Sequence, residues 1–122
     1  MIPKFRAWDK ETQTMIDVSL IDFKKRELVG EHWEFGETNF INFDEIELMQ
    51  STGLFDKNNT EIFEGDIVRV LDSTYTVFYD NERGSYRLKP HDDRWNVDYM
   101  SNFSHGGNFE VVGNIYENKE YL

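Results

Sequence analysis

The chain has 122 residues, of which 24 are acidic and 13 are basic, so its formal net charge is −11. Such a charge opposes long-range attraction to nucleic acid and to anionic membranes, and we do not expect direct binding to either. The chain contains no cysteine, which excludes disulfide bonds and thiolate zinc sites. Ten Phe, six Tyr and three Trp stand against a single alanine, Ala7, and this balance predicts β structure.

The first part of the chain reads as strands joined by polar turns. Lys4–Trp8 and Met15–Phe23 carry apolar residues at alternating positions and predict a hairpin. We expect a third strand at Trp33–Phe35. Phe40–Gln50 mixes helical spacing with alternation, and we expect a strand in its second half after a short turn around Asp44–Glu45.

Leu48–Val70, which reads LMQSTGLFDKNNTEIFEGDIVRV, is the most distinctive stretch. We expect the chain to leave a strand at Thr52-Gly53 through a positive φ at the glycine, and to turn at Asp56–Asn59. A second turn should lead into a strand at Ile67–Leu71. The residues expected to serve backbone geometry are Gly53, Asp56, Asn58, Glu64, Gly65, Asp66 and, further along, Gly113.

The second part of the chain alternates short β-rich runs with turns. Tyr75–Asp80 and Ser85–Lys89 form the next expected hairpin, and Pro90 ends it. His91–Asn108 is long and polar. Phe109–Tyr116 is the last expected strand, with a bulge at Gly113. Short strands at regular spacing predict a small barrel rather than a fold of long helices.

Three blocks resemble the YopX family of phage- and prophage-encoded proteins. They are Lys4–Asp9 (KFRAWD), Leu48–Val70 and Val111–Asn118 (VVGNIYEN). The resemblance implies an SH3-like barrel and an origin in a phage or prophage of Gram-positive bacteria. Together with the absence of cysteine, this origin leads us to expect the protein in the cytoplasm of the bacterial host. It transfers no catalytic residue. The family commonly reads Lys-Asn-Gly where this chain has Lys57-Asn58-Asn59, and asparagine tolerates the left-handed region less freely than glycine.

The sequence therefore predicts a mainly β protein in a single domain, 1–122. Within it, we expect N-terminal strands in residues 1–50, packed on an SH3-like barrel in residues 51–122, with the barrel itself over about Ser51–Tyr116. No apolar run reaches the roughly 18 residues of a membrane helix, so we expect no membrane association.

His91 and Asp93 are the nearest approach to a metal site, because residues two apart on a strand share a face. His105 and His32 could complete such a site only through folding. Zinc or non-haem iron needs three or four convergent ligands, and the spacing does not supply them. We therefore expect no metal and no other cofactor. A metal-dependent hydrolase built on His91 and Asp93 is the least favoured of three hypotheses.

Two further clusters have structural explanations. Glu61, Glu64 and Asp66 could be paired carboxylates of a hydrolase, but Asp66 is placed to accept backbone N–H bonds in the turn before a strand. A basic run interleaved with aromatic residues is more consistent with salt bridges across a hairpin than with nucleic-acid binding. That run comprises Arg83, Arg87, Lys89 and Arg94, with Tyr86 within it and Trp95 directly after it.

The aromatic residues exceed what one small core can hide, so some should form an interface. The candidates are Trp8, Trp33, Phe40, Phe43, Phe55 and Phe63. Our leading hypothesis is a non-enzymatic phage accessory protein that forms a homo-oligomer and binds a host or phage protein. The alternative is an acidic mimic of nucleic acid that inhibits a host DNA-binding or defence protein. It requires one face lined by carboxylates such as Glu45, Glu47, Asp56, Glu61, Glu64 and Glu82.

Overall fold

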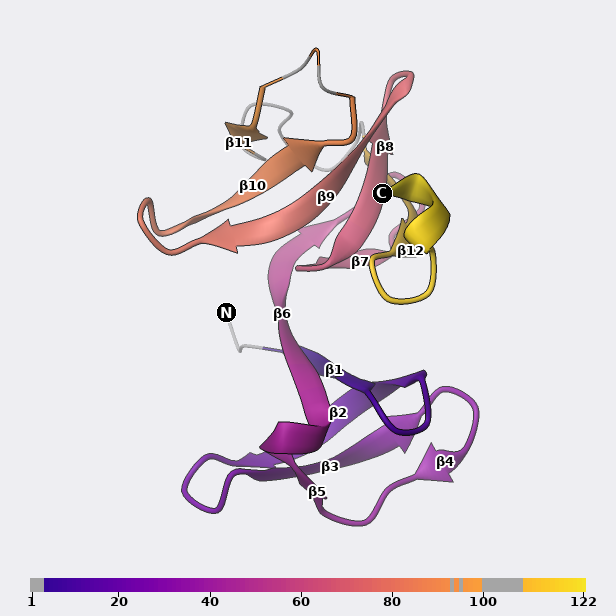
Figure 1. Cartoon of the computed structure of the whole chain (residues 1–122), viewed down its shortest axis with the longest axis vertical. Coiled ribbons are helices and arrows are strands. Elements are labelled where there is room, and N and C mark those ends of the chain that lie inside the picture. The colour runs from indigo at the N-terminus through magenta and orange to yellow at the C-terminus, as the bar shows by residue number, and fades with distance from the viewer. Residues whose placement is uncertain (1–3, 93, 95, 100–108) are drawn as a thin grey trace. The chain divides into compact units, whose positions relative to one another are not determined.

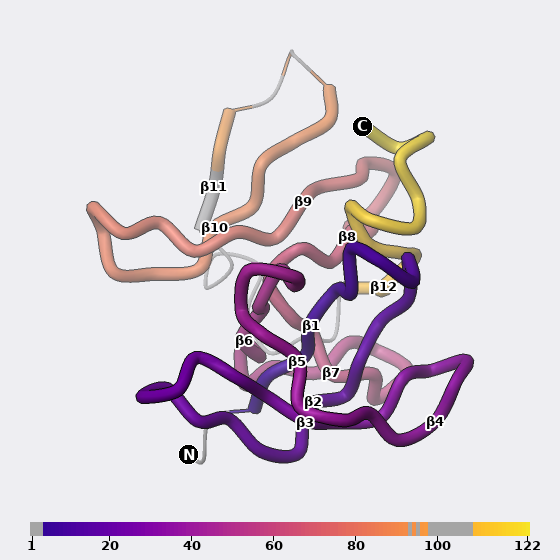
Figure 2. The backbone as a smooth tube through the Cα atoms, turned by 60° about the horizontal axis from the view of Figure 1, so that its bottom comes forward, coloured from indigo at the N-terminus to yellow at the C-terminus, as the bar shows by residue number. Residues whose placement is uncertain are grey.

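The computed structural model describes residues 4–92, 94, 96–99 and 109–122, and its backbone is drawn in Figures 1 and 2. The chain forms two compact units, Met1–Gln50 and Ser51–Leu122. Strand β6 (Ile46–Phe55) runs from the first unit into the second.

The first unit is an antiparallel sheet whose strands follow the order β4-β3-β2-β1-β6, with β5 also paired to β3. The predicted first hairpin is present as β1 and β2, and the predicted short turn before β6 is the 3-10 helix η1. The elements before β6 are β1 (Phe5–Asp9), β2 (Thr14–Asp22), β3 (Glu27–His32), β4 (Gly36–Glu37), β5 (Ile41–Asn42) and η1 (Phe43–Glu45).

The expected third strand at Trp33–Phe35 is wrong, because these residues form the turn between β3 and β4. The strand lies just before them at Glu27–His32. Its inward positions include Leu28 and Gly30, and a glycine carries no side chain to mark the alternation. Trp33 and Phe35 gave the stronger pattern, yet both are exposed.

One face of this sheet carries the core of the first unit. Ala7, Ile16, Leu28 and Ile46 are buried there, with Val18, Ile21, Ile41, Phe43 and Leu48 packed around them. Ala7 lies opposite Ile16 in the β1–β2 ladder, and its small side chain leaves room for that neighbour.

The second unit contains a sheet with the order β11-β10-β9-β8-β12, and β7 pairs with the end of β6. Consecutive hairpins join β8, β9 and β10, and β12 returns to pair with β8. Its elements are β7 (Glu61–Phe63), β8 (Asp66–Val70), β9 (Ser73–Asp80), β10 (Ser85–Pro90), β11 (Asp98–Tyr99), β12 (Phe109–Asn114) and η3 (Lys119–Tyr121).

The core of the second unit is formed by side chains from β7, β8, β9, β10 and β12. It comprises Ile62, Val68, Val70, Tyr75, Val77, Leu88 and Phe109. In β8, Val68 and Val70 join this cluster, Ile67 is also buried, and Arg69 is exposed.

The mainly β fold class is confirmed, since the strands pair into two antiparallel sheets. The closed SH3-like barrel is not seen: β11 and β12 are the two ends of their sheet, and the described residues give no pairing between them. The part of the chain that the structure describes has no helix with the length and apolar content needed to span a membrane.

Glycine marks irregularities in two strands. Gly53 has the expected positive φ, 80°, but β6 continues past it to Phe55, so the chain does not leave the strand there. The β6–β7 register is instead interrupted between Ser51 and Phe55. In β12 the register shifts between Val111 and Gly113, where a bulge was expected.

Candidate functional site

His91, the first residue of the expected metal site, is engaged by two hydroxyl groups. Its Nδ1 lies 2.9 Å from the Thr74 hydroxyl and its Nε2 lies 2.7 Å from the Thr76 hydroxyl. Burial and the nearby charge of Lys89 lower the pKa of His91. Both ring nitrogens are therefore used to hold the end of β10 against β9.

The other predicted ligands do not join His91. Asp93 and His105 lie outside the described residues, and His32 belongs to the first unit, where its Nε2 lies 2.9 Å from Asp9 Oδ2. No group of three His, Cys, Asp or Glu side chains that could hold a metal ion occurs in ranges 4–92, 94, 96–99 and 109–122.

The carboxylates around the β7–β8 turn have structural contacts. Asp66 is 1% exposed and its Oδ2 accepts a hydrogen bond from the Phe63 N–H at 2.8 Å. The Ser51 hydroxyl donates to Glu61 at 2.5 Å. Gly65, between Glu64 and Asp66, has a φ of 86°. Burial, followed by the charge of Glu64 and the neighbouring Tyr79, raises the pKa of Tyr86.

Asp56 holds together the turn between β6 and β7. Its Oδ1 accepts the backbone N–H groups of Asn58 and Thr60, and its Oδ2 accepts that of Val111 in β12, each at 2.8 Å. Burial raises the pKa of this carboxyl, but the three hydrogen bonds outweigh burial and leave the pKa below its usual value. Asn59 has the positive φ of this turn, 64°.

The carboxylates named for a nucleic-acid mimic do not form one exposed set. Asp56 is only 6% exposed, Glu47 lies 3.4 Å from Lys10 Nζ, and Glu61 is bonded to Ser51. Glu45 and Glu47 belong to the first unit, whereas Glu61 and the remaining members belong to the second.

Three of the four basic residues in this run form ion pairs. Arg83 and Arg87 each place Nη1 3.0 Å from Asp80 Oδ2, and Arg94 Nη2 lies 2.6 Å from Asp92 Oδ2. Trp95 lies outside the described residues, and Lys89 is exposed. Arg87 on β10 and Asp80 on β9 form the cross-hairpin salt bridge that the sequence favoured over nucleic-acid binding.

The predicted interface aromatics divide into three groups. Trp8 is buried, with 7% of its surface exposed, so it cannot contribute to a surface patch. Phe43 and Phe63 are half-buried. Trp33, Phe40 and Phe55 are exposed.

Two further exposed aromatics escaped the sequence analysis, Phe23 and Phe35, each 64% exposed. Phe23 directly precedes the charged turn Lys24–Arg26, and Phe35 directly precedes Gly36, whose φ is 81°. Their position beside turn residues was the available signal, because turns lie at the surface.

The turn between β3 and β4 holds its two aromatic rings in place. Trp33 donates its indole N–H to Asp17 Oδ1 at 3.1 Å, and its backbone N–H to the Met15 carbonyl at 2.9 Å. The Phe35 ring packs edge-on against His32, with centroids 5.8 Å apart. A partner would therefore meet rings that are already ordered, which lowers the entropic cost of binding.

Three carboxylates lie in a row beside Trp33. Asp17 on β2 is directly opposite Glu31 on β3, and Glu31 is directly opposite Glu37 on β4. Directly opposite residues share a face of the sheet, and like charges in such positions are destabilising. None of these three carboxylates forms an ion pair within the described residues. We call Asp17, Glu31 and Glu37 the acidic row.

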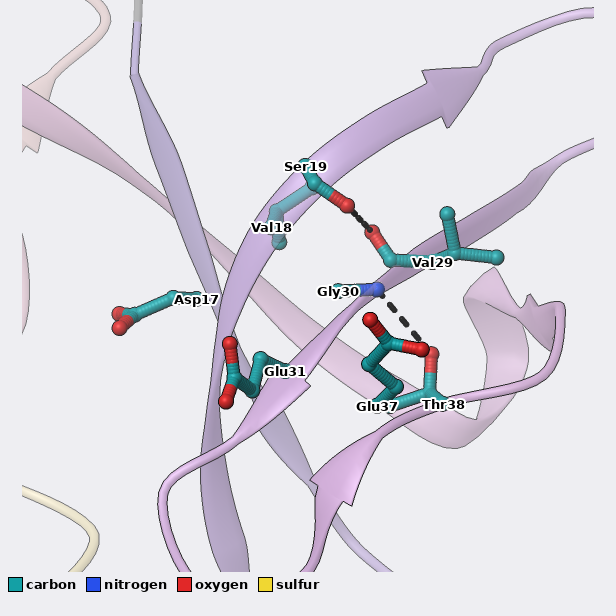
Figure 3. Close-up of a pocket in the computed structure, with 8 residues that line it drawn as sticks. All are labelled: Asp17, Val18, Ser19, Val29, Gly30, Glu31, Glu37 and Thr38. Atoms are coloured by element: carbon teal, nitrogen blue, oxygen red, sulfur yellow. Dashed lines mark hydrogen bonds between the residues drawn. The ribbon is translucent and has the colours of Figure 1, made fainter.

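The acidic row borders a hollow of about 500 Å³ that is also lined by Val18, Ser19, Val29, Gly30 and Thr38. Figure 3 shows Glu31 and Glu37 extending from their strands in different directions, so these two carboxylates do not converge. The arrangement is thus unlike a metal centre. It is an open, negatively charged surface that can take cationic groups.

Gly30 is essential to the packing beneath this surface. A Cβ at this position would collide with the Asp17 carbonyl oxygen and lie 2.7 Å from Ile16 Cγ2. The Gly30 N–H donates to the Thr38 hydroxyl at 3.1 Å, and the Gly30 carbonyl accepts from the Thr38 N–H at 2.9 Å. Glycine therefore allows β2, β3 and the chain after β4 to approach closely.

A comparison with protein families matches residues 4–122 to the family described as YopX protein. The chain belongs to the YopX family. The YopX match spans the three blocks that carried the resemblance in the sequence. Protein EF1440 from Enterococcus faecalis is a similar solved structure, with a TM-score of 0.68 and 30% identity over 100% of this chain and 99% of that chain. No curated protein matches the chain.

Proposed function

We propose that this YopX chain is a non-catalytic accessory protein of a phage or prophage that works by binding another protein in the bacterial cytoplasm. The carrying observation is a set of five large apolar side chains that are exposed on the first unit. It comprises Leu20, Phe23, Trp33, Phe35 and Phe40, which are between 49% and 64% exposed.

Exposed aromatic rings of this number point to recognition rather than to a reaction. Aromatic residues are enriched at protein interfaces and carry much of their binding energy. The titratable groups considered for chemistry, such as His91, Asp56 and Asp66, are occupied by hydroxyl or backbone partners. For the second unit we propose an open sheet related to the SH3-like barrel. Two features support this: β8, β9 and β10 pair consecutively, and β12 pairs with β8.

The test replaces Trp33, Phe35 and Phe40 together by Ser in the full chain. The protein with and without these changes is used for affinity capture from a bacterial host lysate, and its solution mass is measured over a range of concentrations. A control variant, Leu71→Ser, removes a side chain of the second unit that is 86% exposed.

The proposal expects a specific partner, either a different protein or a second copy, to bind the unmodified chain and Leu71→Ser at least about tenfold more tightly than the triple variant. Equal binding by all three proteins would overturn it. Circular dichroism establishes that the triple variant is folded, which is expected because the replaced side chains are largely exposed.

A further inference from the structure

The turn between β2 and β3 has the opposite charge to the acidic row. It consists of Phe23–Arg26, and all four side chains are exposed. Arg26 lies 3.5 Å from Asp44 and 5.5 Å above the Phe43 ring, so it is engaged within its own unit. Lys24 and Lys25 have no ion pair within the described part of the chain. We call Phe23–Arg26 the basic turn.

The ring of Phe23 is held at the base of this turn. It packs edge-on against Phe5 and Phe43, with centroid distances of 6.5 and 6.0 Å, while most of its surface stays exposed. The basic turn thus presents two free ammonium groups beside one ordered aromatic ring. The acidic row presents three carboxylates beside one ordered indole.

The basic turn and the acidic row cannot neutralise each other within one molecule. Both belong to the β2–β3 hairpin, but the turn closes one end of it and the Asp17–Glu31 pair lies near the other. Phe23 lies six positions after Asp17, directly after the end of β2, which corresponds to about 20 Å of extended chain. The hydrogen-bonded ladder holds them apart, so any contact between them joins two molecules.

We propose that the acidic row of one copy receives the basic turn of a second copy. The inference rests on the proposed function and names the partner: another molecule of the same chain. Lys24 and Lys25 lie among Asp17, Glu31 and Glu37, which relieves the repulsion between the opposed carboxylates, and Phe23 approaches Trp33. The hollow is within the range of about 300–1,000 Å³ typical of binding pockets, which accommodates side chains of a turn.

This contact is heterologous, because it joins two different surfaces of the same chain. After the first contact one copy keeps its acidic row free and the other keeps its basic turn free, so assembly continues to a closed ring or to an open chain of molecules. A turn in a hollow is smaller than the roughly 1,200 Å² of a stable interface, and the association is therefore weak and dependent on concentration.

The experiment uses two charge-reversed variants of the full chain. One is Lys24→Glu with Lys25→Glu, and the other is Glu31→Lys with Glu37→Lys. Sedimentation equilibrium measures the mass of each variant, of their equimolar mixture and of the unmodified protein. Matched controls reverse the same charges elsewhere: Lys89→Glu with Lys119→Glu, and Glu11→Lys with Asp72→Lys.

Each test variant alone is expected to raise the apparent dissociation constant at least about tenfold, because it places like charges against each other. The mixture is expected to regain association, since the acidic turn of one variant meets the basic row of the other. Both controls keep the association of the unmodified protein. Regain in the mixture cannot come from a variant that has failed to fold.

Association that survives both reversals, or a mixture that stays dissociated, would overturn this inference while leaving the aromatic triple variant to decide the proposed function. An unmodified protein that is monomeric at every concentration would also overturn it. In that case binding of a lysine-rich peptide by the acidic row would identify a foreign basic partner in place of the second copy.

Discussion

At the scale of single residues, the Asp56–Thr60 turn shows how this chain tolerates a departure from the common pattern of its family. Asn59 occupies the left-handed region with a φ of 64°, at the position where the family resemblance gives glycine. Three hydrogen bonds to Asp56 hold the turn around it, so the strain of one residue does not open the turn.

We predict that Asn59→Gly raises the free energy of unfolding by about 0.5 kcal/mol, because glycine enters the left-handed region without a steric penalty. The neighbouring change, Asn58→Gly, should lower it by about 0.5–1 kcal/mol, since Asn58 has no positive φ and glycine adds only entropy to the unfolded chain. Urea unfolding of both variants measures the two shifts. Stabilisation by Asn58→Gly but not by Asn59→Gly would contradict this account.

The contribution of His91 to folding stability depends on pH. Burial, with Lys89, places its folded pKa below the unfolded value. The unfolded chain therefore binds more protons in the interval between the two, and stability falls as the pH decreases through it. The contribution is complete above the unfolded pKa of about 6.5 and is lost as the pH passes the folded pKa.

We predict that His91→Gln, which does not titrate, costs about 1 kcal/mol at pH 7.5 through weakened bonds to Thr74 and Thr76. The stability difference between unmodified protein and variant should shrink as the pH is lowered to 5. Urea unfolding at several pH values measures this difference, and the comparison cancels contributions that the two proteins share. A difference that grows toward low pH would reverse the assigned sign.

At the scale of elements, the sequence predicts strands well where side chains on both faces mark the alternation. The β1–β2 and β9–β10 hairpins were predicted for this reason. The alternation failed at β3, where Gly30 occupies a buried position and the exposed Trp33 and Phe35 mimic a strand.

The acidic row could not be predicted from the sequence for a related reason. The acidic row depends on the register of three strands, which places Asp17, Glu31 and Glu37 side by side although each comes from a different strand. Two of these strands were not predicted, and a shift of one residue would have moved the carboxylates to opposite faces. The exposed aromatics could be expected in part from composition, but composition does not show that Trp8 is buried.

We predict that Gly30→Ala destabilises the first unit by about 2–3 kcal/mol. The added Cβ collides with the Asp17 carbonyl oxygen, which belongs to the backbone and cannot move away without disturbing the β2–β3 ladder. Gly36→Ala is the control, because nothing lies within 4 Å of a Cβ there and only its φ of 81° is unfavourable. That change should cost about 1 kcal/mol.

Thermal unfolding followed by circular dichroism compares the two alanine variants. Gly30→Ala should also weaken any interaction made through the acidic row, since Gly30 fixes the spacing of β2 and β3 beneath it. Equal melting temperatures for the two variants would show that the close approach at Gly30 is not needed.

At the scale of the whole molecule, the net charge of −11 lowers the stability of the folded chain. Charges of one sign repel more strongly in a compact state than in an extended one. Both units contribute to this repulsion, because Met1–Gln50 has 11 acidic and 6 basic residues and Ser51–Leu122 has 13 acidic and 7 basic residues.

We predict that raising sodium chloride from about 0.01 to 0.15 M shortens the Debye length from roughly 30 to 8 Å and stabilises the protein by about 1 kcal/mol, or about 4 °C in melting temperature. A variant with Glu11→Gln, Glu45→Gln and Asp72→Asn removes three exposed charges that form no ion pair in the described ranges. It should melt higher at low salt and respond less to added salt. Because surface ion pairs such as Lys10–Glu47 weaken in salt, a fall in melting temperature would mean that local pairing outweighs the repulsion of the whole chain.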